Sequence, residues 1–210
     1  MPAARPLSPN EWVVLALVAE RPTHGWALAA GLGPGGELGS IRALSRPVVY
    51  HALDRLEQEA KIRAARIERG GRGPHRVVYE ATPRGLRDLH AWLRAPVERV
   101  RELSSLFQLK VVLSKRLGVD PESLLVAQRA LLLPLAGLLE AQLDESDPEP
   151  AAERTLLASS LETVCSALRL IEGLLDVLVA VSRAPPGRPA SGAARSAARP
   201  APTSSRSSGS

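Results

Sequence analysis

Cysteine, aromatic residues and long apolar runs are scarce in this chain of 210 residues. Cys165 is the single cysteine, which excludes an intramolecular disulfide and, with only four histidines, a cysteine-rich zinc site. We expect Cys165 to serve packing alone. No apolar run reaches the about eighteen residues of a membrane helix, and no apolar segment precedes a cleavage site near the N-terminus. These absences predict a cytoplasmic protein with no membrane partner.

Charge is divided unevenly along the chain. Residues 1–95 carry 14 Lys and Arg against 9 Asp and Glu, residues 96–183 carry 9 against 13, and residues 184–210 carry 4 against none. The basic first part indicates a polyanionic partner, with nucleic acid the first to consider. The last part, built mainly of Pro, Gly, Ser, Ala and Arg, predicts a disordered basic tail. It either adds sequence-independent affinity for DNA or is an inert extension.

The first part has the pattern of three helices, a hairpin and a fourth helix. The predicted elements are a helix over Pro9–Glu20 behind the capping box Ser8-Pro9-Asn10-Glu11, a short helix capped by Thr23, a helix capped by Ser45, a two-stranded hairpin made of Ile62–Glu68 and the run through Val77, Tyr79 and Ala81, and a helix opened by Thr82-Pro83. This order is typical of the winged helix-turn-helix, so residues 1–95 are predicted to form a DNA-binding domain.

The part after Pro96 is rich in leucine at helical spacing, and we expect residues 96–183 to form an α-helical, coiled-coil-like dimerisation domain. One helix is capped by Asp120-Pro121, and Pro134 should kink or divide it. The segment from about Ala151 to Arg183 carries a heptad seam, which needs a partner helix. The seam consists of Leu157, Leu161, Val164, Leu168, Ile171, Leu175 and Leu178.

The third helix of the first part is the predicted reading element. Its apolar stripe leaves polar side chains on the outer face, where they can reach base edges or phosphates in the major groove. Arg55 has two alternatives: it contacts a phosphate, or it pairs with Glu59 one turn further on. The candidate DNA contacts of this helix are Ser45, Arg46, Tyr50, His51 and Arg55.

The turn of the hairpin is the second predicted contact with DNA. Its glycines allow the backbone to come close to a phosphate strand, and arginines at a hairpin tip point outward. The alternative is a solubilising charged turn, although only Glu68 offsets the basic groups locally. The candidate contacts of this wing are Arg66, Arg69, Arg72, His75 and Arg76.

Neither a nucleotide-binding motif nor a catalytic motif is supported by the sequence. Gly31, Gly33 and Gly36 fit a dinucleotide-binding spacing, but a helix rather than a strand precedes them. No Ser, His or Asp has a spacing that places a nucleophile beside a base. We therefore predict that the protein is not an enzyme and that it needs no metal or cofactor.

From Leu7 to about Leu93 the sequence resembles the PadR family of bacterial transcriptional regulators. The residues that carry the resemblance are Leu7-Ser8-Pro9, Pro22-Thr23-His24-Gly25-Trp26, Ser45 followed by Tyr50, Leu53, Leu56 and Glu57, Gly71-Arg72-Gly73-Pro74 with Val78-Tyr79, and Thr82-Pro83-Arg84-Gly85 before Trp92-Leu93. The resemblance implies a homodimeric repressor that binds double-stranded DNA at an inverted-repeat operator. It also implies that a small molecule, in some relatives an aromatic one, releases the DNA.

Three features depart from that family pattern. Trp26 stands where relatives commonly carry tyrosine, the glycines from Gly31 to Gly39 loosen the turn before the reading helix, and Pro47 lies in the first turn of that helix.

The three tryptophans have two alternative roles. Trp12, Trp26 and Trp92 either border an effector pocket or pack in the core or the dimer interface.

A different class of function also fits the pattern. The protein would then be an adaptor whose leucine-rich helices recruit another chain, with the basic part as a general surface, since a heptad seam does not identify its partner.

Overall fold

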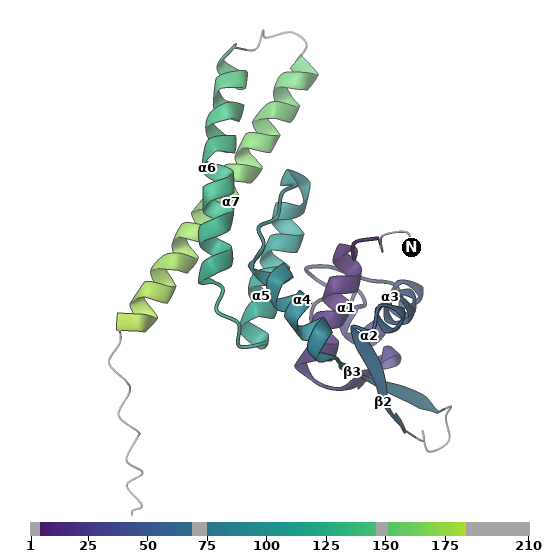
Figure 1. The fold of residues 1–210 in the computed structure, drawn as a ribbon. Helices are drawn as coiled ribbons and strands as arrows, with labels where there is room; N and C mark the ends of the chain where they lie inside the picture. Colours follow the sequence, from purple (N-terminus) through teal and green to yellow (C-terminus); the bar gives the residue numbers. More distant parts are fainter. Residues whose placement is uncertain (1–4, 69–74, 146–150, 184–210) are drawn as a thin grey trace, which may run out of the picture.

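The structure, a computed structural model, describes residues 5–68, 75–145 and 151–183, with side chains up to residue 180. It is mainly helical with one small sheet (Figure 1). The elements are α1 (Pro9–Glu20), β1 (Thr23–His24), α2 (Gly25–Leu32), α3 (Arg46–Gln58), β2 (Ile62–Glu68), β3 (Arg76–Ala81), α4 (Pro83–Arg94), the 3-10 turn η1 (Val100–Glu102), the π-helical turn η2 (Leu103–Phe107), α5 (Gln108–Arg116), α6 (Glu122–Glu145) and α7 (Ala151–Arg183). The predicted contacts Arg69 and Arg72 and the predicted basic tail lie outside the described residues.

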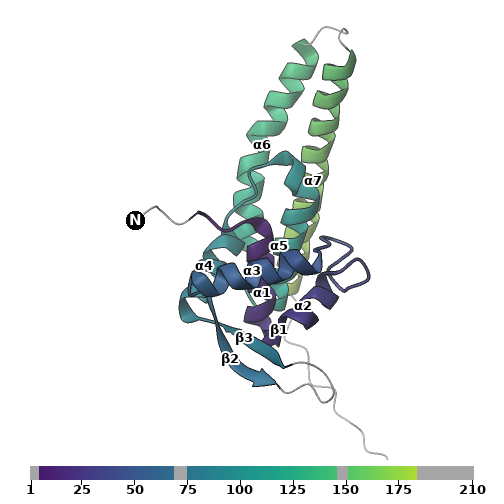
Figure 2. The ribbon, with the colours of Figure 1, turned by 90° about the vertical axis from the view of Figure 1, so that its right-hand side faces the viewer.

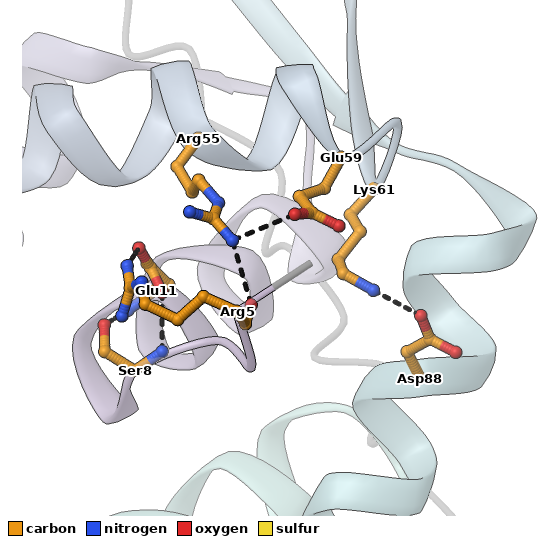
Figure 3. A network of polar contacts seen from close by, with 7 residues as sticks. All are labelled: Arg5, Ser8, Glu11, Arg55, Glu59, Lys61 and Asp88. Atoms are coloured by element: carbon orange, nitrogen blue, oxygen red, sulfur yellow. Dashed lines mark hydrogen bonds and ion pairs between the residues drawn. The ribbon is translucent and has the colours of Figure 1, made fainter. Parts of the chain in front are cut away.

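The capping box predicted for the first helix is present at the start of α1. The Ser8 N–H donates to Glu11 Oε2 at 2.5 Å, and the Glu11 N–H donates to Ser8 Oγ at 3.4 Å. Arg5 adds an ion pair to the other Glu11 oxygen at 2.9 Å (Figure 3). Burial of Glu11 acts to raise the pKa of its carboxyl group, but the bonds from Ser8 and the charge of Arg5 outweigh burial and lower it.

The other predicted caps are partly confirmed. Thr82 Oγ1 accepts from the Gly85 N–H at 3.0 Å, and Asp120 Oδ1 accepts from the Glu122 N–H at 3.0 Å. The prediction that Thr23 caps α2 is wrong, because Thr23 lies in β1 and His24 Nδ1 accepts from the Ala27 N–H.

Ser45 occupies the N-cap position of α3 but makes no capping hydrogen bond. Pro47, two residues on, has no N–H to offer, so one of the two usual donors to an N-cap side chain is absent.

The sheet has three strands rather than the predicted two, in the order β1-β3-β2 and antiparallel throughout. β1 is only two residues long and pairs Thr23 with Tyr79 and His24 with Val78. A strand this short has no periodicity to detect, which is why the sequence pattern missed it. Within β3, Val78 is fully buried and Val77 is exposed.

A left-handed residue ends α3 and starts the turn into β2. Ala60 has φ +54° and its N–H donates to Glu57 O, while the Lys61 N–H donates to Leu56 O. These two bonds form a Schellman motif, in which glycine is the usual residue. Ala60 thus costs roughly 1 kcal/mol relative to glycine, and the motif fixes the path of Lys61 toward the sheet.

Two hydrophobic cores lie on either side of α5. The first is formed by α1, α2, α3, α4 and the sheet, together with Leu109, Leu113 and Val119. The second is formed by η2, α6 and α7 around Phe107, which is fully buried. α5 therefore contributes to both cores, and the division of the chain at residues 95 and 96 remains a proposal. Figure 1 shows α4 and α5 between the first core and the long α6–α7 pair.

The heptad seam of α7 has a partner within the chain. Val164 and Ile171 are fully buried in the second core, where the other five seam residues are partly buried against it. α6 and α7 pack against each other: they cross in Figure 1 and lie next to each other in Figure 2. The seam thus packs against α6 of the same chain, so the partner helix that it needs is supplied within the chain.

α6 continues without a break across Pro134, so of the two predicted outcomes, a kink or a division of the helix, the division does not occur. α6 is also the one helix in the described part of the chain that is long and apolar enough to cross a membrane, by length and composition alone. This differs from the prediction that no segment qualifies. The buried residues of α6, including Leu124, Leu125 and Leu132, pack into the second core.

Candidate functional site

The outer face of α3 carries the polar side chains that the sequence predicts. Val49, Leu53 and Leu56 are buried in the first core, which leaves the opposite face to solvent. Tyr50 is 43% exposed on that face, unusually open for an aromatic side chain. The exposed polar residues of α3 and its N-cap are Ser45, Arg46, Tyr50, His51, Asp54, Glu57 and Gln58. Figure 2 shows α3 and the β2–β3 hairpin on the face turned to the viewer, with α6 and α7 behind them.

Charge changes sign along α3. Its first two turns hold Arg46, Tyr50 and His51, whereas the later turns add the exposed carboxylates Asp54 and Glu57. Carboxylates on this face repel phosphates. The N-terminal half of α3 is therefore the half suited to a polyanion.

Arg55 takes part in a network inside the protein. Its Nη2 donates to the Arg5 carbonyl oxygen at 2.9 Å and to Glu59 Oε1 at 3.0 Å (Figure 3). Of the two alternatives for this side chain, the pair with Glu59 is therefore present in the structure. The same network ties the segment before α1 to the end of α3.

A cleft of about 500 Å³ opens between the start of α2, the first turns of α3 and the start of β3. We call it the α2–β3 cleft. Its lining is His24, Gly25, Trp26, Arg46, Tyr50, His75, Arg76, Val77 and Tyr79. Two arginines, two histidines and three aromatic rings therefore surround a space that no carboxylate lines. Such a lining favours an anion that also offers apolar surface.

Trp26 forms the α2 wall of the cleft. Its ring is 49% exposed, and the Arg76 guanidinium lies 5.1 Å from the ring centroid, within the range of a cation–π contact. The His24 ring centroid is 6.2 Å away. His24 Nδ1 accepts the Ala27 N–H at 3.1 Å, so the ring proton of a neutral His24 is on Nε2.

Gly25 allows Tyr50 to pack closely against α2. A Cβ at Gly25 would lie 2.8 Å from Tyr50 Cε1 and 3.1 Å from Leu53 Cδ1. Any side chain at this position would push the Tyr50 ring aside. Glycine here therefore fixes the orientation of the exposed tyrosine on α3.

Tyr79 forms the floor of the cleft from β3. Burial, followed by the charges of Glu57 and Asp54 and the neighbouring Tyr50, raises the pKa of its phenol. The phenol thus keeps its proton and its ability to donate a hydrogen bond across the neutral range.

The predicted wing residues are divided between the strands. Arg66 on β2 donates to a single oxygen of Glu68, from its Nε at 3.1 Å and from its Nη2 at 2.7 Å. His75 and Arg76 instead line the α2–β3 cleft. The structure therefore brings these two together with Arg46 and Tyr50 of α3.

The three tryptophans do not share a pocket in the described structure. Trp12 and Trp92 stack with their centroids 5.5 Å apart and pack against the first core. Lys61 lies over Trp12 and Lys110 over Trp92. Trp26 lies apart from this pair in the α2–β3 cleft.

His24, Gly25 and Tyr79 were not among the residues predicted for the site. For His24 and Gly25 the available signal was the run His24-Gly25-Trp26, which follows Thr23 directly and resembles the family pattern. The cleft itself forms only when β1 pairs with β3, because that pairing places His24 beside Val78.

The fold of α1–α4 with the three-stranded sheet defines a winged helix-turn-helix protein, the class predicted from the sequence. Residues 14–91 match the family model described as the transcriptional regulator PadR-like family. The matched segment runs from α1 to α4, the winged helix-turn-helix part of the chain.

Comparison with solved structures finds Bacillus subtilis PadR in complex with operator DNA. That chain is 18% identical, the match covers 83% of this chain and 99% of that one, and the TM-score is 0.42. No curated protein matches this chain significantly.

Proposed function

We propose that the protein is a sequence-specific DNA-binding transcriptional regulator of the cytoplasm. The observation that carries this proposal is the continuous surface made by the first turns of α3 and the α2–β3 cleft, where Arg46, Tyr50, His75 and Arg76 lie together without a carboxylate. A helix of this kind enters the major groove while the adjoining hairpin reaches the backbone or the minor groove. The family match supports the same class of function.

The residues of this surface are proposed to have different roles. Tyr50, Arg46 and His51 on the exposed half of α3 would reach base edges, because they project from the face that enters the groove. Ser45 would donate to a phosphate at the start of the helix. The wing residues Arg66, Arg69 and Arg72 would contact phosphates without reading sequence.

We further propose that the protein is a homodimer that uses a second seam on α7. The heptad seam is occupied by α6, but α7 carries another row at alternating three- and four-residue spacing on a different face. This outer seam consists of Leu156, Ser159, Thr163, Ser166, Leu170, Gly173 and Val177. Its apolar members Leu156, Leu170 and Val177 are exposed, and its central residues line an open groove beside η2. Small side chains at the centre allow a second helix to approach closely.

The outer seam gives a direct prediction for the oligomeric state. Leu170→Glu should convert the dimer to a monomer, because the dimer would have to bury the new carboxylate in its interface. The fold of the single chain should not change, because Leu170 is exposed there. Sedimentation velocity at micromolar concentration measures the change. Leu138→Glu, at another exposed leucine, on α6 outside the seam, serves as the control and should remain dimeric. A dimer that survives Leu170→Glu but not Leu138→Glu would place the interface on α6 instead.

A dimer of this kind is proposed to repress transcription by covering an inverted-repeat operator. The test is selection of bound duplexes from a random pool by the full chain at near-physiological salt, which suppresses nonspecific phosphate binding. We expect an inverted repeat with half-sites about one helical turn apart. A folded dimer that enriches no duplex would overturn the proposal and favour the adaptor class.

The reading role of α3 has its own prediction. Tyr50→Ala and Arg46→Gln should each weaken binding to the enriched duplex by roughly tenfold or more, and binding to a scrambled duplex far less, because base contacts carry the discrimination. Fluorescence anisotropy of labelled duplexes measures both affinities. Arg129→Gln, an equal loss of charge on α6, is the control and should leave both affinities unchanged. Equal losses on both duplexes would assign these side chains to the DNA backbone.

A further inference from the structure

The α2–β3 cleft contains several hydrogen-bond donors without an acceptor. Among the described residues, the indole N–H of Trp26 has no hydrogen-bond partner, and the Arg76 guanidinium has no ion pair. Nε2 of neutral His24 carries a proton, since Nδ1 is occupied as an acceptor. Arg46 adds a second guanidinium from α3. The walls thus offer donors and positive charge, and a carboxylate is absent from the lining.

We propose that this cleft binds one sugar-phosphate unit of the DNA backbone and that Trp26 is a DNA-contact residue outside α3 and the wing. This inference rests on the proposed function. A phosphate beside Arg76 would accept from its guanidinium and from the Trp26 N–H. The flat indole face offers the apolar surface against which a deoxyribose ring packs.

A backbone contact fits the position of Trp26 better than a base contact. Trp26 lies on α2, beside the α3 face that carries Tyr50 rather than on it, with the cleft between them. Donors without acceptors suit phosphate oxygens, whereas base edges present both donors and acceptors. Trp26 should therefore add affinity on every duplex and leave the choice of sequence to α3.

Arg76 has a second role in the same site. Its contact with the Trp26 ring joins β3 to α2 across the mouth of the cleft. The pair holds the start of β3 against α2 before DNA arrives, so that less freedom is lost on binding.

Anisotropy titrations of full-length protein test the proposal, using the enriched duplex and a scrambled duplex of equal length. Trp26→Ala should weaken both by the same factor, about tenfold, and Trp26→Phe should weaken both by a smaller factor because it retains a ring without the N–H. Arg76→Gln should lower the slope of log affinity against log salt by about one. Leu138→Ala, at an exposed apolar site far from the cleft, is the matched control and should change neither affinity nor slope.

Tryptophan fluorescence supplies a readout that a purely structural role would not move. Adding duplex should quench wild-type emission with the same midpoint as the anisotropy titration, and Trp26→Phe should abolish the quench, because Trp12 and Trp92 stack away from the cleft. Unchanged affinity for Trp26→Ala, or a loss confined to the enriched duplex, would overturn the backbone assignment while leaving the regulator proposal intact. Failure of the wild-type chain to bind either duplex would instead overturn the proposed function itself.

Discussion

Gly85→Ala is expected to destabilise the protein by about 3 kcal/mol, the cost of overpacking a site that cannot relax. A Cβ on Gly85 would lie 2.1 Å from the Lys61 carbonyl oxygen and 2.9 Å from its carbonyl carbon. Both contacts are to backbone, and that carbonyl accepts from the Thr82 N–H at 2.9 Å and from Thr82 Oγ1 at 3.1 Å. α4 cannot move away without breaking its own N-cap. Chemical denaturation at fixed protein concentration measures the loss.

Gly137→Ala is the matched control for that substitution. Gly137 also lies within a helix, but a Cβ there meets nothing within 4 Å. Alanine should therefore raise the free energy of unfolding by roughly 0.5–1 kcal/mol, the usual difference in helix propensity. A neutral Gly85→Ala beside a stabilising Gly137→Ala would show that α4 and the turn at Lys61 can separate at little cost.

Lys110 is expected to make the protein more stable as the pH rises above 8. Its ammonium is buried between α4 and α5 and donates to the carbonyl oxygens of Trp92 and Ala95, each at 2.7 Å. Burial lowers the pKa of Lys110 from 10.5 to about 8. Between these two values the unfolded chain binds the proton that the folded chain has released, so the free energy of unfolding increases with pH. The increase should reach about 2 kcal/mol between pH 7 and 9.5.

Denaturation curves at several pH values check this slope. Lys110→Met should flatten it, because methionine fills the site without a proton to release. Lys115→Met, an exposed lysine on the same helix, is the control and should retain the wild-type slope. Ending the series at pH 9.5 avoids Tyr79, whose raised pKa has the opposite effect at higher pH. A wild-type slope that Lys110→Met leaves unchanged would assign the pH dependence to another group.

The local elements could be predicted because their signals lie within a few residues of one another. The box of Ser8 and Glu11, the cap at Thr82 and the alternation over Ile62–Glu68 each specify a structure by short-range geometry. The outward face of α3 follows equally from the spacing of its buried residues. The errors occurred where a longer-range contact decided the outcome, as at Thr23, which pairs with Tyr79.

The candidate site could be predicted only in part for the same reason. Arg46 and Tyr50 were identified from one helix face, but their association with His75 and Arg76 depends on how the sheet meets α2. Trp26 was grouped with Trp12 and Trp92 because the sequence shows that all three lie in the first part of the chain but does not show their positions in space. In the structure Trp26 lies in the cleft, while the other two stack in the first core.

By itself the sequence determined the order of the main helices and of the β2–β3 hairpin, the class of fold, the basic first part and the apolar seam of α7. Each is a matter of spacing or composition, which the chain carries locally. Only the tertiary structure decided that α6 covers that seam, that Arg55 pairs with Glu59 and that His24 caps α2. The physical reason is that a periodic pattern shows which face must be buried, whereas the partner that buries it is selected by packing between residues distant in the sequence.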